Sequence, residues 1–262
     1  MVTALITGAS AGIGAIFAQE LAARGYGLVL IARSQDKLEQ LAHTLQAQYR
    51  VPVEIIVQDL TEPTAAAIVF EQVQQKGIAI DLLINNAGIG DYGDFAENDR
   101  ELQLRIIQLN ILALVDLTHR FLQPMRQQRS GSIVNLASVA AFQTMPYFSI
   151  YSATKAFVLS FSEALWAENQ KYNVHVLAVC PGPAGKAFFK QAGFPSVLVD
   201  AAAWVETPAT VVVRETLAAL DQRQSIVIPG NSANQLLAAF PRVLPREAVA
   251  SLWKTILGFG RN

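Results

Sequence analysis

A tyrosine and a lysine in the second half of the chain have the spacing that proton transfer requires. The segment reads Tyr151-Ser-Ala-Thr-Lys155. On a helix, residues four apart share one face, so the phenol and the ammonium group point into the same space. A cation beside a phenol stabilises the phenolate, so we expect Lys155 to lower the pKa of Tyr151 from its usual value of about 10. Such a tyrosine can act as a general acid or base. Taken alone, the pair also fits a tyrosine and a lysine on a helix surface.

A glycine-rich segment near the N-terminus, residues 7–14, lies between a short apolar strand and a helix. There Gly8 permits a tight turn, Gly12 lets the backbone approach a pyrophosphate, and Gly14 allows close helix packing; the helix N-terminus favours the phosphate charge. The spacing is Gly-x-x-x-Gly-x-Gly, so a glycine-rich turn without a nucleotide is the alternative. The cofactor contacts expected in this turn come from Gly8, Ser10, Gly12, Ile13 and Gly14.

The residues after the second predicted strand indicate which dinucleotide binds. An acidic residue at this point accepts hydrogen bonds from the ribose of NAD, whereas this chain has Ala32 and Arg33. Arg33 can form a charge-assisted contact with the 2′-phosphate of NADP(H), and Ser10 adds a hydroxyl donor. We therefore expect NADP(H) to be preferred over NAD(H). A solvated arginine at the end of a strand is the alternative.

The elements that must position these residues alternate along the chain. The 262 residues are 52% apolar and 16% charged, enough for one α/β domain with a core on both faces of its sheet. Strands are expected at 2–7, 26–32, 53–57, 81–85, 132–138, 174–180 and 225–229. Helices are expected at about 12–24, 35–49, 63–76, 99–125, 149–171, 208–220 and 246–257. This alternation predicts a doubly wound, Rossmann-type parallel sheet. Without an interdomain linker, residues 1–262 are expected to form a single domain, with a substrate lid at about 183–207.

Composition excludes several other classes of protein. Lys and Arg (20) nearly balance Asp and Glu (21), so we expect no nucleic-acid partner. Cys180 is the one cysteine, and its apolar strand suits a buried hydrophobe. The three histidines, His43, His119 and His175, form no cluster, so no metal is expected. No segment is apolar over the ~20 residues that a membrane-spanning helix needs. The uncharged N-terminus lacks a basic opening, so we expect a cytoplasmic protein.

Together these residues resemble the short-chain dehydrogenase/reductase family over nearly the whole chain. The matching features are the turn at 7–14, Asp59, Asn85-Asn86-Ala87-Gly88, Asn110, Ser138, Tyr151-x-x-x-Lys155 and Pro181-Gly182. The resemblance implies a single Rossmann-type domain with a seven-stranded parallel sheet, and a homodimer or homotetramer. It places further cofactor contacts at Asp59, Leu60, Asn86, Ala87, Gly88, Tyr151, Lys155, Pro181 and Gly182.

The resemblance also implies a reaction, the reversible transfer of a hydride between a nicotinamide and a carbonyl or alcohol carbon. Its catalytic set maps onto Asn110, Ser138, Tyr151 and Lys155, with Ser138 and Tyr151 touching the substrate. Ser138 ends a strand at the carboxyl edge of the sheet, where its hydroxyl can donate to a carbonyl oxygen. Asn110 interrupts an apolar helix, and a water that joins it to Lys155 would satisfy its amide. Asp59 could instead cap the next helix.

The chain departs from the family at one position. Lys186 stands where the family usually has a threonine that contacts the nicotinamide carboxamide. A solvated lysine is one explanation. The departure also leaves open an alternative function, an NADP(H)-binding sensor or scaffold without turnover, although the intact set of Asn110, Ser138, Tyr151 and Lys155 argues against it. A sugar-nucleotide epimerase or dehydratase with the same Tyr–Lys pair is a third possibility, but the chain is short for it and its glycine spacing differs.

Apolar residues near the predicted catalytic edge indicate a lipophilic substrate, although lid-to-core packing explains them equally well. They are Phe142, Met145, Tyr147, Phe148, Phe188, Phe189, Phe194, Val197, Leu198 and Trp204. The amphipathic helix at about 246–257 is a cap, a partner surface or a membrane-surface contact, in that order of preference. The expected partner is thus a small carbonyl or alcohol compound.

Overall fold

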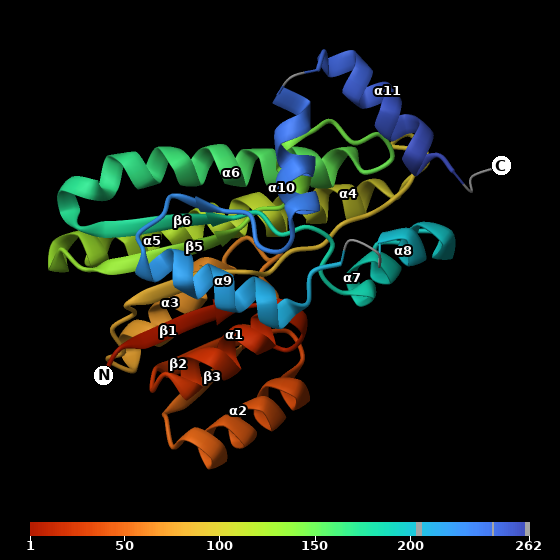
Figure 1. Ribbon diagram of the computed structural model, residues 1–262. Helices are drawn as coiled ribbons and strands as arrows, with labels where there is room; N and C mark the ends of the chain where they lie inside the picture. The colour runs from red at the N-terminus through yellow and green to blue at the C-terminus, as the bar shows by residue number, and fades with distance from the viewer. Residues whose placement is uncertain (203–205, 243, 260–262) are drawn as a thin grey trace.

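The architecture is that of a computed structural model, which describes residues 1–202, 206–242 and 244–259. The chain forms one seven-stranded parallel sheet in the order β3-β2-β1-β4-β5-β6-β7 (Figure 1), which confirms the predicted Rossmann-type α/β fold. The strands are β1 (Thr3–Thr7), β2 (Gly27–Ala32), β3 (Val53–Val57), β4 (Leu82–Asn85), β5 (Gly131–Leu136), β6 (Val174–Val179) and β7 (Ile226–Val227).

Helices cover both faces of this sheet. Helices α1 (Gly12–Ala23), α2 (Gln35–Tyr49) and α9 (Ala209–Asp221) pack on one face. Helices α3 (Ala65–Gln75), α5 (Leu114–Gln128) and α6 (Ser149–Asn169) pack on the other. The remaining helices are α4 (Arg100–Ile107), α7 (Lys186–Gln191), α8 (Ser196–Ala202), α10 (Ser232–Ala239) and α11 (Arg246–Leu257), and α7, α8, α10 and α11 lie beyond the carboxyl ends of the strands (Figure 1).

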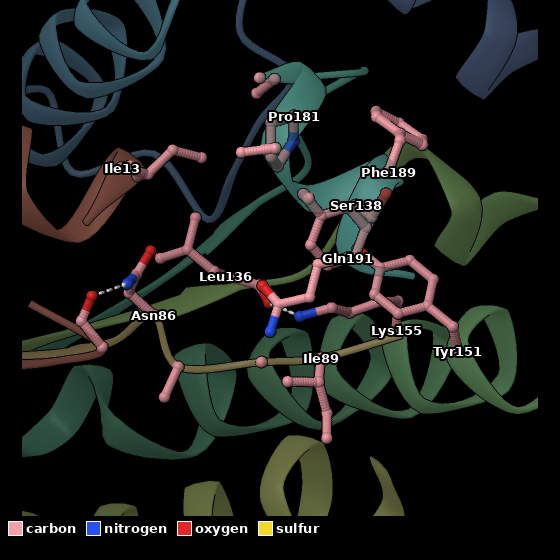
Figure 2. A pocket seen from close by; sticks show the side chains of 18 of the residues that line it. Ile13, Asn86, Ile89, Leu136, Ser138, Tyr151, Lys155, Pro181, Phe189 and Gln191 are labelled. Atoms are coloured by element: carbon pink, nitrogen blue, oxygen red, sulfur yellow. Dashed lines mark hydrogen bonds between the residues drawn. The ribbon is translucent and has the colours of Figure 1, made fainter. Parts of the chain in front are cut away.

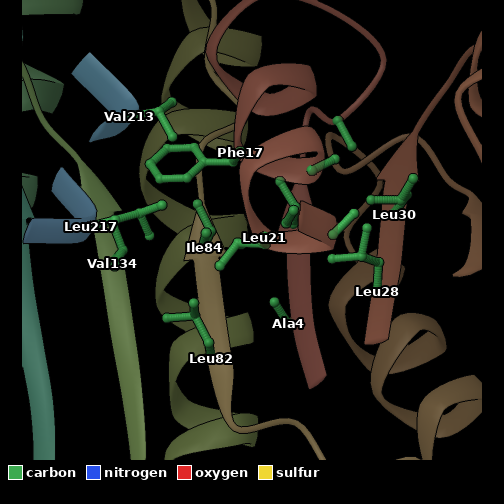
Figure 3. Close-up of a cluster of buried hydrophobic side chains, with 14 of the residues drawn as sticks. Ala4, Phe17, Leu21, Leu28, Leu30, Leu82, Ile84, Val134, Val213 and Leu217 are labelled. Carbon is green, nitrogen blue, oxygen red and sulfur yellow. The ribbon is translucent and has the colours of Figure 1, made fainter. Parts of the chain in front are cut away.

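The core is built by alternating strand side chains. Along β1, Ala4 and Ile6 join one buried cluster and Leu5 joins the cluster on the opposite face, as the period of two in a strand requires. Figure 3 shows Phe17 of α1 beside Val213 of α9, above the sheet. Because all strands are parallel, the loops after β1, β2, β4, β5 and β6 meet at one edge, where α/β proteins bind their ligands.

Two predicted elements differ from the structure. The helix expected over 99–125 is interrupted by a π-helical turn at Gln108–Ala113 that contains Asn110. Such a turn holds one residue more than an α-helical turn and is frequent at functional sites. The last strand occupies only Ile226–Val227, because Pro229 has no N–H for the ladder and Gly230 turns the chain at a φ of 104°.

Candidate active site

Hydrogen bonds hold the glycine turn (residues 7–14) against the loop after β4. The Thr7 hydroxyl accepts hydrogen bonds from the N–H groups of Asn86 (2.9 Å) and Ala87 (3.0 Å). Asn86 Nδ2 donates to the carbonyl of Thr7 at 2.9 Å. A Cβ on Gly8 would lie 2.9 Å from Asn86 Nδ2, and one on Gly14 would lie 2.6 Å from it. The close approach of these two loops therefore requires glycine at both positions.

The N-terminus of α1 faces the cavity at this turn. Gly8 and Gly12 have φ angles of 66° and 55°, which glycine adopts without strain. No side chain caps the helix, so its first N–H groups are available to an anion. Gly8, Ser10, Gly12 and Ile13 line the cavity, whereas Gly14 packs beneath the turn. This geometry suits a pyrophosphate.

Two arginines approach one carboxylate where β2 and β3 end. Asp59 Oδ2 lies 3.7 Å from Arg33 Nη1 and 3.9 Å from Arg105 Nη2 of α4. Lys37, in the first turn of α2, lines the same part of the chain's main cavity. No pattern in the sequence indicates Arg105, because α4 reaches this edge only through the fold. The result is a site with excess positive charge.

Asp59 is held as a carboxylate. Burial alone would raise its pKa, but hydrogen bonds from the N–H and hydroxyl of Thr61, together with the charges of Arg33 and Arg105, keep the pKa below its usual value. The contacts with Thr61 are local, and α3 has Thr64 as its N-cap residue. Asp59 therefore does not cap the following helix, which was the alternative from the sequence.

Ser138, Tyr151 and Lys155 converge at the opposite end of the same cavity (Figure 2). Ser138 follows β5 and forms a side-chain hydrogen bond with Tyr151. Lys155 is buried; its Nζ donates to the carbonyl of Leu136 at 2.6 Å and lies 5.6 Å from the ring centroid of Tyr151. Pro181 and Gly182, directly after Cys180 at the end of β6, line the cavity beside them. The predicted proton-transfer group is thus assembled from β5 and α6.

The prediction that Lys155 lowers the pKa of Tyr151 below its usual value is wrong. Burial raises the pKa of Tyr151 to about 12, and the hydrogen bond with Ser138 opposes this only in part. Burial likewise lowers the pKa of Lys155 to about 8. Desolvation disfavours the charged form of both groups, and here it exceeds the mutual stabilisation inferred from their spacing. At neutral pH Tyr151 is therefore a phenol, which is a proton donor.

Asn110 lies behind the cavity wall. Its side chain exchanges hydrogen bonds of 3.0 Å with the N–H and the carbonyl of Ile89, and its Nδ2 donates to Thr154 Oγ1 at 3.1 Å. A Cβ on Gly88 would lie 3.2 Å from Asn110 Oδ1 and 3.5 Å from Lys155 Nζ. The π-helical turn thus places the side-chain amide of Asn110 on the same side of Gly88 as Lys155. Through its hydrogen bonds with Ile89, Asn110 also holds the loop that contains Gly88.

One cavity of about 1140 Å³ connects the glycine turn to the proton-transfer group. Its far half is aromatic: the ring of Phe148 stacks on that of Tyr151 at 4.3 Å, and Phe188 lies 5.4 Å from Tyr151. Of the apolar residues singled out in the sequence, six line the cavity, namely Met145, Phe148, Phe188, Phe189, Phe194 and Leu198. Phe142, Tyr147 and Val197 are not among the lining residues, and Trp204 lies outside the described residues. Trp253, Ile256 and Leu257 of α11 also line it, which agrees with the cap preferred for this helix from the sequence, although no single one of them was singled out there.

Hydrogen bonds hold the two ends of the segment at residues 183–207 together. Thr207 N–H donates to the carbonyl of Pro183 at 2.8 Å, and Gly185 N–H donates to Glu206 at 3.0 Å. Lys186 Nζ contacts Asp200 Oδ1 at 3.0 Å, and its side chain is 48% exposed. Lys186 therefore links α7 to α8 on the surface and is not among the residues that line the cavity.

The described residues offer neither a membrane span nor a metal cluster. They contain no helix that is both long and apolar enough to span a membrane. In the same part of the chain, no three His, Cys, Asp or Glu side chains group in a way that could hold a metal ion.

Comparisons with known proteins agree with this geometry. The family model for short chain dehydrogenases matches residues 2–193. A very-long-chain 3-oxoacyl-CoA reductase from Anas platyrhynchos is 35% identical over 185 residues, covering 68% of this chain and 58% of the relative. The chain thus spans somewhat more than half the length of that relative.

Two solved structures are also similar. A short-chain dehydrogenase from Sphingobium yanoikuyae in complex with NADPH is 36% identical, with a TM-score of 0.80 over 87% of both chains. The bulky-bulky ketone specific alcohol dehydrogenase from Comamonas testosteroni is 30% identical, with a TM-score of 0.77 over 97% of this chain and 98% of that one.

Proposed function

The chain belongs to the short-chain dehydrogenase/reductase family, a family of oxidoreductases that use a nicotinamide cofactor, and from this premise we propose that it interconverts a carbonyl and an alcohol with NADP(H). The observation that carries the proposal is the pairing of Ser138 with Tyr151 in the same cavity as the glycine turn. A binding module would need no proton donor at the far end of a nucleotide site.

The residues present fit a dinucleotide. The open N-terminus of α1 and the turn from Gly8 to Gly14 suit the pyrophosphate, and Asp59 and Leu60 suit the adenine. Lys155, Pro181 and Gly182 border the nicotinamide end. When bound there, the cofactor supplies or accepts the hydride.

Tyr151 supplies the proton. In the direction of reduction its phenol donates to the carbonyl oxygen of the substrate, and Ser138 holds that oxygen by a second hydrogen bond. A pKa of about 12 keeps the phenol protonated at neutral pH, as a proton donor in reduction requires. In the direction of oxidation the phenol oxygen of Tyr151 must first lose its proton. Lys155, held by Leu136, then stabilises the phenolate by its charge.

NADP(H) preference is supported by charge. Arg33 is 58% exposed and 3.7 Å from Asp59, so its guanidinium can turn to a 2′-phosphate while Arg105 remains beside the carboxylate. Lys37 and the uncapped N-terminus of α2 add positive potential at the same place. The Sphingobium yanoikuyae relative forms a complex with NADPH, which is consistent with this proposal.

A lipophilic substrate is supported by the aromatic half of the cavity. Phe148, Phe188, Phe189 and Phe194 enclose the space next to Tyr151 and leave few polar partners for a hydrophilic substrate. The names of two relatives, a very-long-chain 3-oxoacyl-CoA reductase and a bulky-bulky ketone dehydrogenase, point to the same class. We propose a bulky ketone, a secondary alcohol or an acyl-chain carbonyl compound.

The test is a panel of ketones and alcohols run with NADPH and NADH in parallel and followed at the nicotinamide absorbance. Turnover of apolar ketones with NADPH is expected. Turnover of small hydrophilic carbonyls alone would contradict the substrate class. Tight cofactor binding without any turnover would favour the alternative, an NADP(H)-binding sensor or scaffold, which Lys186 in place of the family threonine keeps open.

We propose further that the protein is a homodimer or homotetramer. Leu112, in the π-helical turn, and Phe157, on α6, are apolar side chains that are 51% and 41% exposed, and Phe157 stacks on Phe161. Light scattering on the purified protein measures the mass of the assembly. The cytoplasmic location expected from the sequence stays a prediction.

A further inference from the structure

Helix α11 forms the end wall of the substrate half of the cavity. Its residues Trp253, Ile256 and Leu257 line the same cavity as Ser138 and Tyr151, although they lie about a hundred positions later in the chain. Ile256 is also 42% exposed and Leu252, on the outer face, is 45% exposed. The wall at this place is therefore a single helix, with the cavity on one side and solvent on the other.

Two hydrogen bonds hold this wall in place. Trp253 Nε1 donates to Gln143 Oε1 at 2.8 Å. The hydroxyl of Tyr92 donates to the carbonyl of Leu257 at the end of the helix. The first of these bonds fixes the direction of the indole, because a partly buried indole N–H has a strong need for an acceptor.

Gln143 connects the wall to the proton-transfer group. It follows the short helix Val139–Phe142, which Ser138 caps by accepting a hydrogen bond from the N–H of Ala140 at 3.1 Å. Gln143 lines the cavity itself. The position of the indole relative to the reacting carbonyl is thus set through residues 138–143, the six residues that join Ser138 to Gln143. A large rigid ring at a fixed distance from the carbonyl limits the length of the group that fits between them.

We propose that Trp253, oriented by Gln143, determines substrate size by limiting how far an apolar chain can extend from the carbonyl carbon towards α11. This inference rests on the proposed oxidoreductase function. In reduction the chain would lie among Phe148, Phe189 and Phe194 and end against the indole. Trp253 is accordingly a specificity-determining residue, without a part in hydride or proton transfer.

The experiment measures kcat/KM for a series of straight-chain 2-alkanones of increasing length, with NADPH, for wild type and three variants. In W253A the optimum is expected to move to longer ketones. The ratio of kcat/KM for the longest to the shortest ketone should rise at least about ten-fold, because one methylene that a pocket rejects already changes kcat/KM by about 10–200-fold. Gln143→Leu, which leaves the indole N–H without its acceptor, is expected to shift the optimum in the same direction by less.

Leu252→Ala is the matched control, since Leu252 lies on the same helix, is exposed and does not line the cavity. It should leave the optimum in place. The Kd for NADPH, read from its fluorescence, should stay unchanged in all variants. If W253A is too unstable to purify, W253F keeps a ring against Gln143 and is expected to give a smaller shift.

An unchanged optimum in W253A or W253F overturns the inference, and so does an equal shift in the Leu252→Ala control, which would assign the effect to the docking of α11 in general. Absence of turnover for every ketone in wild type and variants, with NADPH binding intact, overturns the proposed function together with this inference. A changed optimum in the first two variants alone supports both.

Discussion

Arg33 should decide between the two nicotinamide cofactors. In the structure it is 58% exposed, and its guanidinium is 3.7 Å from Asp59, which is also approached by Arg105. In Arg33→Gln the carboxylate keeps Arg105 and its two hydrogen bonds from Thr61, so it is not left buried without a partner. Loss of such an exposed ion pair changes the free energy of unfolding by about 0–1 kcal/mol. The variant should therefore fold like wild type.

The effect on cofactor binding should be larger and selective. A hydrogen bond to a charged group contributes about 1.5–3 kcal/mol. Because Arg33 is half-exposed and Lys37 remains, we take the lower end, about a ten-fold rise in the Kd for NADPH. NADH lacks the 2′-phosphate, so its Kd should change by less than about three-fold on the same scale. The difference should shrink at high salt, because ions screen an exposed contact.

Fluorescence titration of both reduced cofactors measures these constants without turnover. Arg100→Gln is the control, since Arg100 lies on α4 but pairs with Glu101 at the surface and does not line the cavity. An equal rise in the Kd of NADPH and NADH for Arg33→Gln would refute the argument that Arg33 meets the 2′-phosphate. No change in either constant would refute it as well.

Three further outcomes are expected. Tyr151→Phe should lower kcat by about 10²–10⁴-fold with the Kd for NADPH little changed, and near wild-type turnover would remove Tyr151 from the chemistry. Since burial raises the pKa of Tyr151 to about 12 and lowers that of Lys155 to about 8, kcat/KM for alcohol oxidation should rise by up to ten-fold per pH unit from neutrality to about pH 8 and less steeply above it, where Lys155 loses the charge that stabilises the phenolate; ketone reduction should not rise, and pH profiles in both directions check the sign. Gly14→Ala would place a methyl group 2.3 Å from the carbonyl oxygen of Gly8 and 2.6 Å from Asn86 Nδ2, so overpacking of about 1–3 kcal/mol should lower the melting temperature and weaken NADPH binding, measured by calorimetry and fluorescence; an unchanged variant would show that the glycine turn can shift away from α1 without cost.

The sheet and the glycine turn were predictable because their signals are local. Val29 and Ile31 lie within a run of apolar residues that both faces of a covered strand require, and the glycines at 8 and 14 stand where their Cβ atoms would meet the loop of Asn86. The identity of the site residues came from motif order, which the sequence shows directly. What the structure added there is distance and burial.

Other parts of the site depend on contacts between distant segments. Nothing near Arg105 or Trp253 in the sequence indicates Asp59 or Gln143 as a partner, since 46 and 110 positions separate the members of each pair. The predicted direction of the pKa shift of Tyr151 was wrong for a related reason. The spacing of two residues on a helix shows that they are neighbours, but it does not show how much water they lose on burial. Desolvation is a property of the assembled cavity.

The π-helical turn at Gln108–Ala113 has a consequence for how insertions and deletions would act on this enzyme. Removing one residue there would restore a regular α-helix and rotate the preceding segment by about 100° relative to α5, the angle per residue in an α-helix. The amide of Asn110 would then point away from Ile89 and Thr154, although every other residue of the site would be unchanged. The direction of the Asn110 side chain thus depends on the number of residues in the turn as well as on their types. Deleting one residue of this turn should therefore lower activity more than most point substitutions in it.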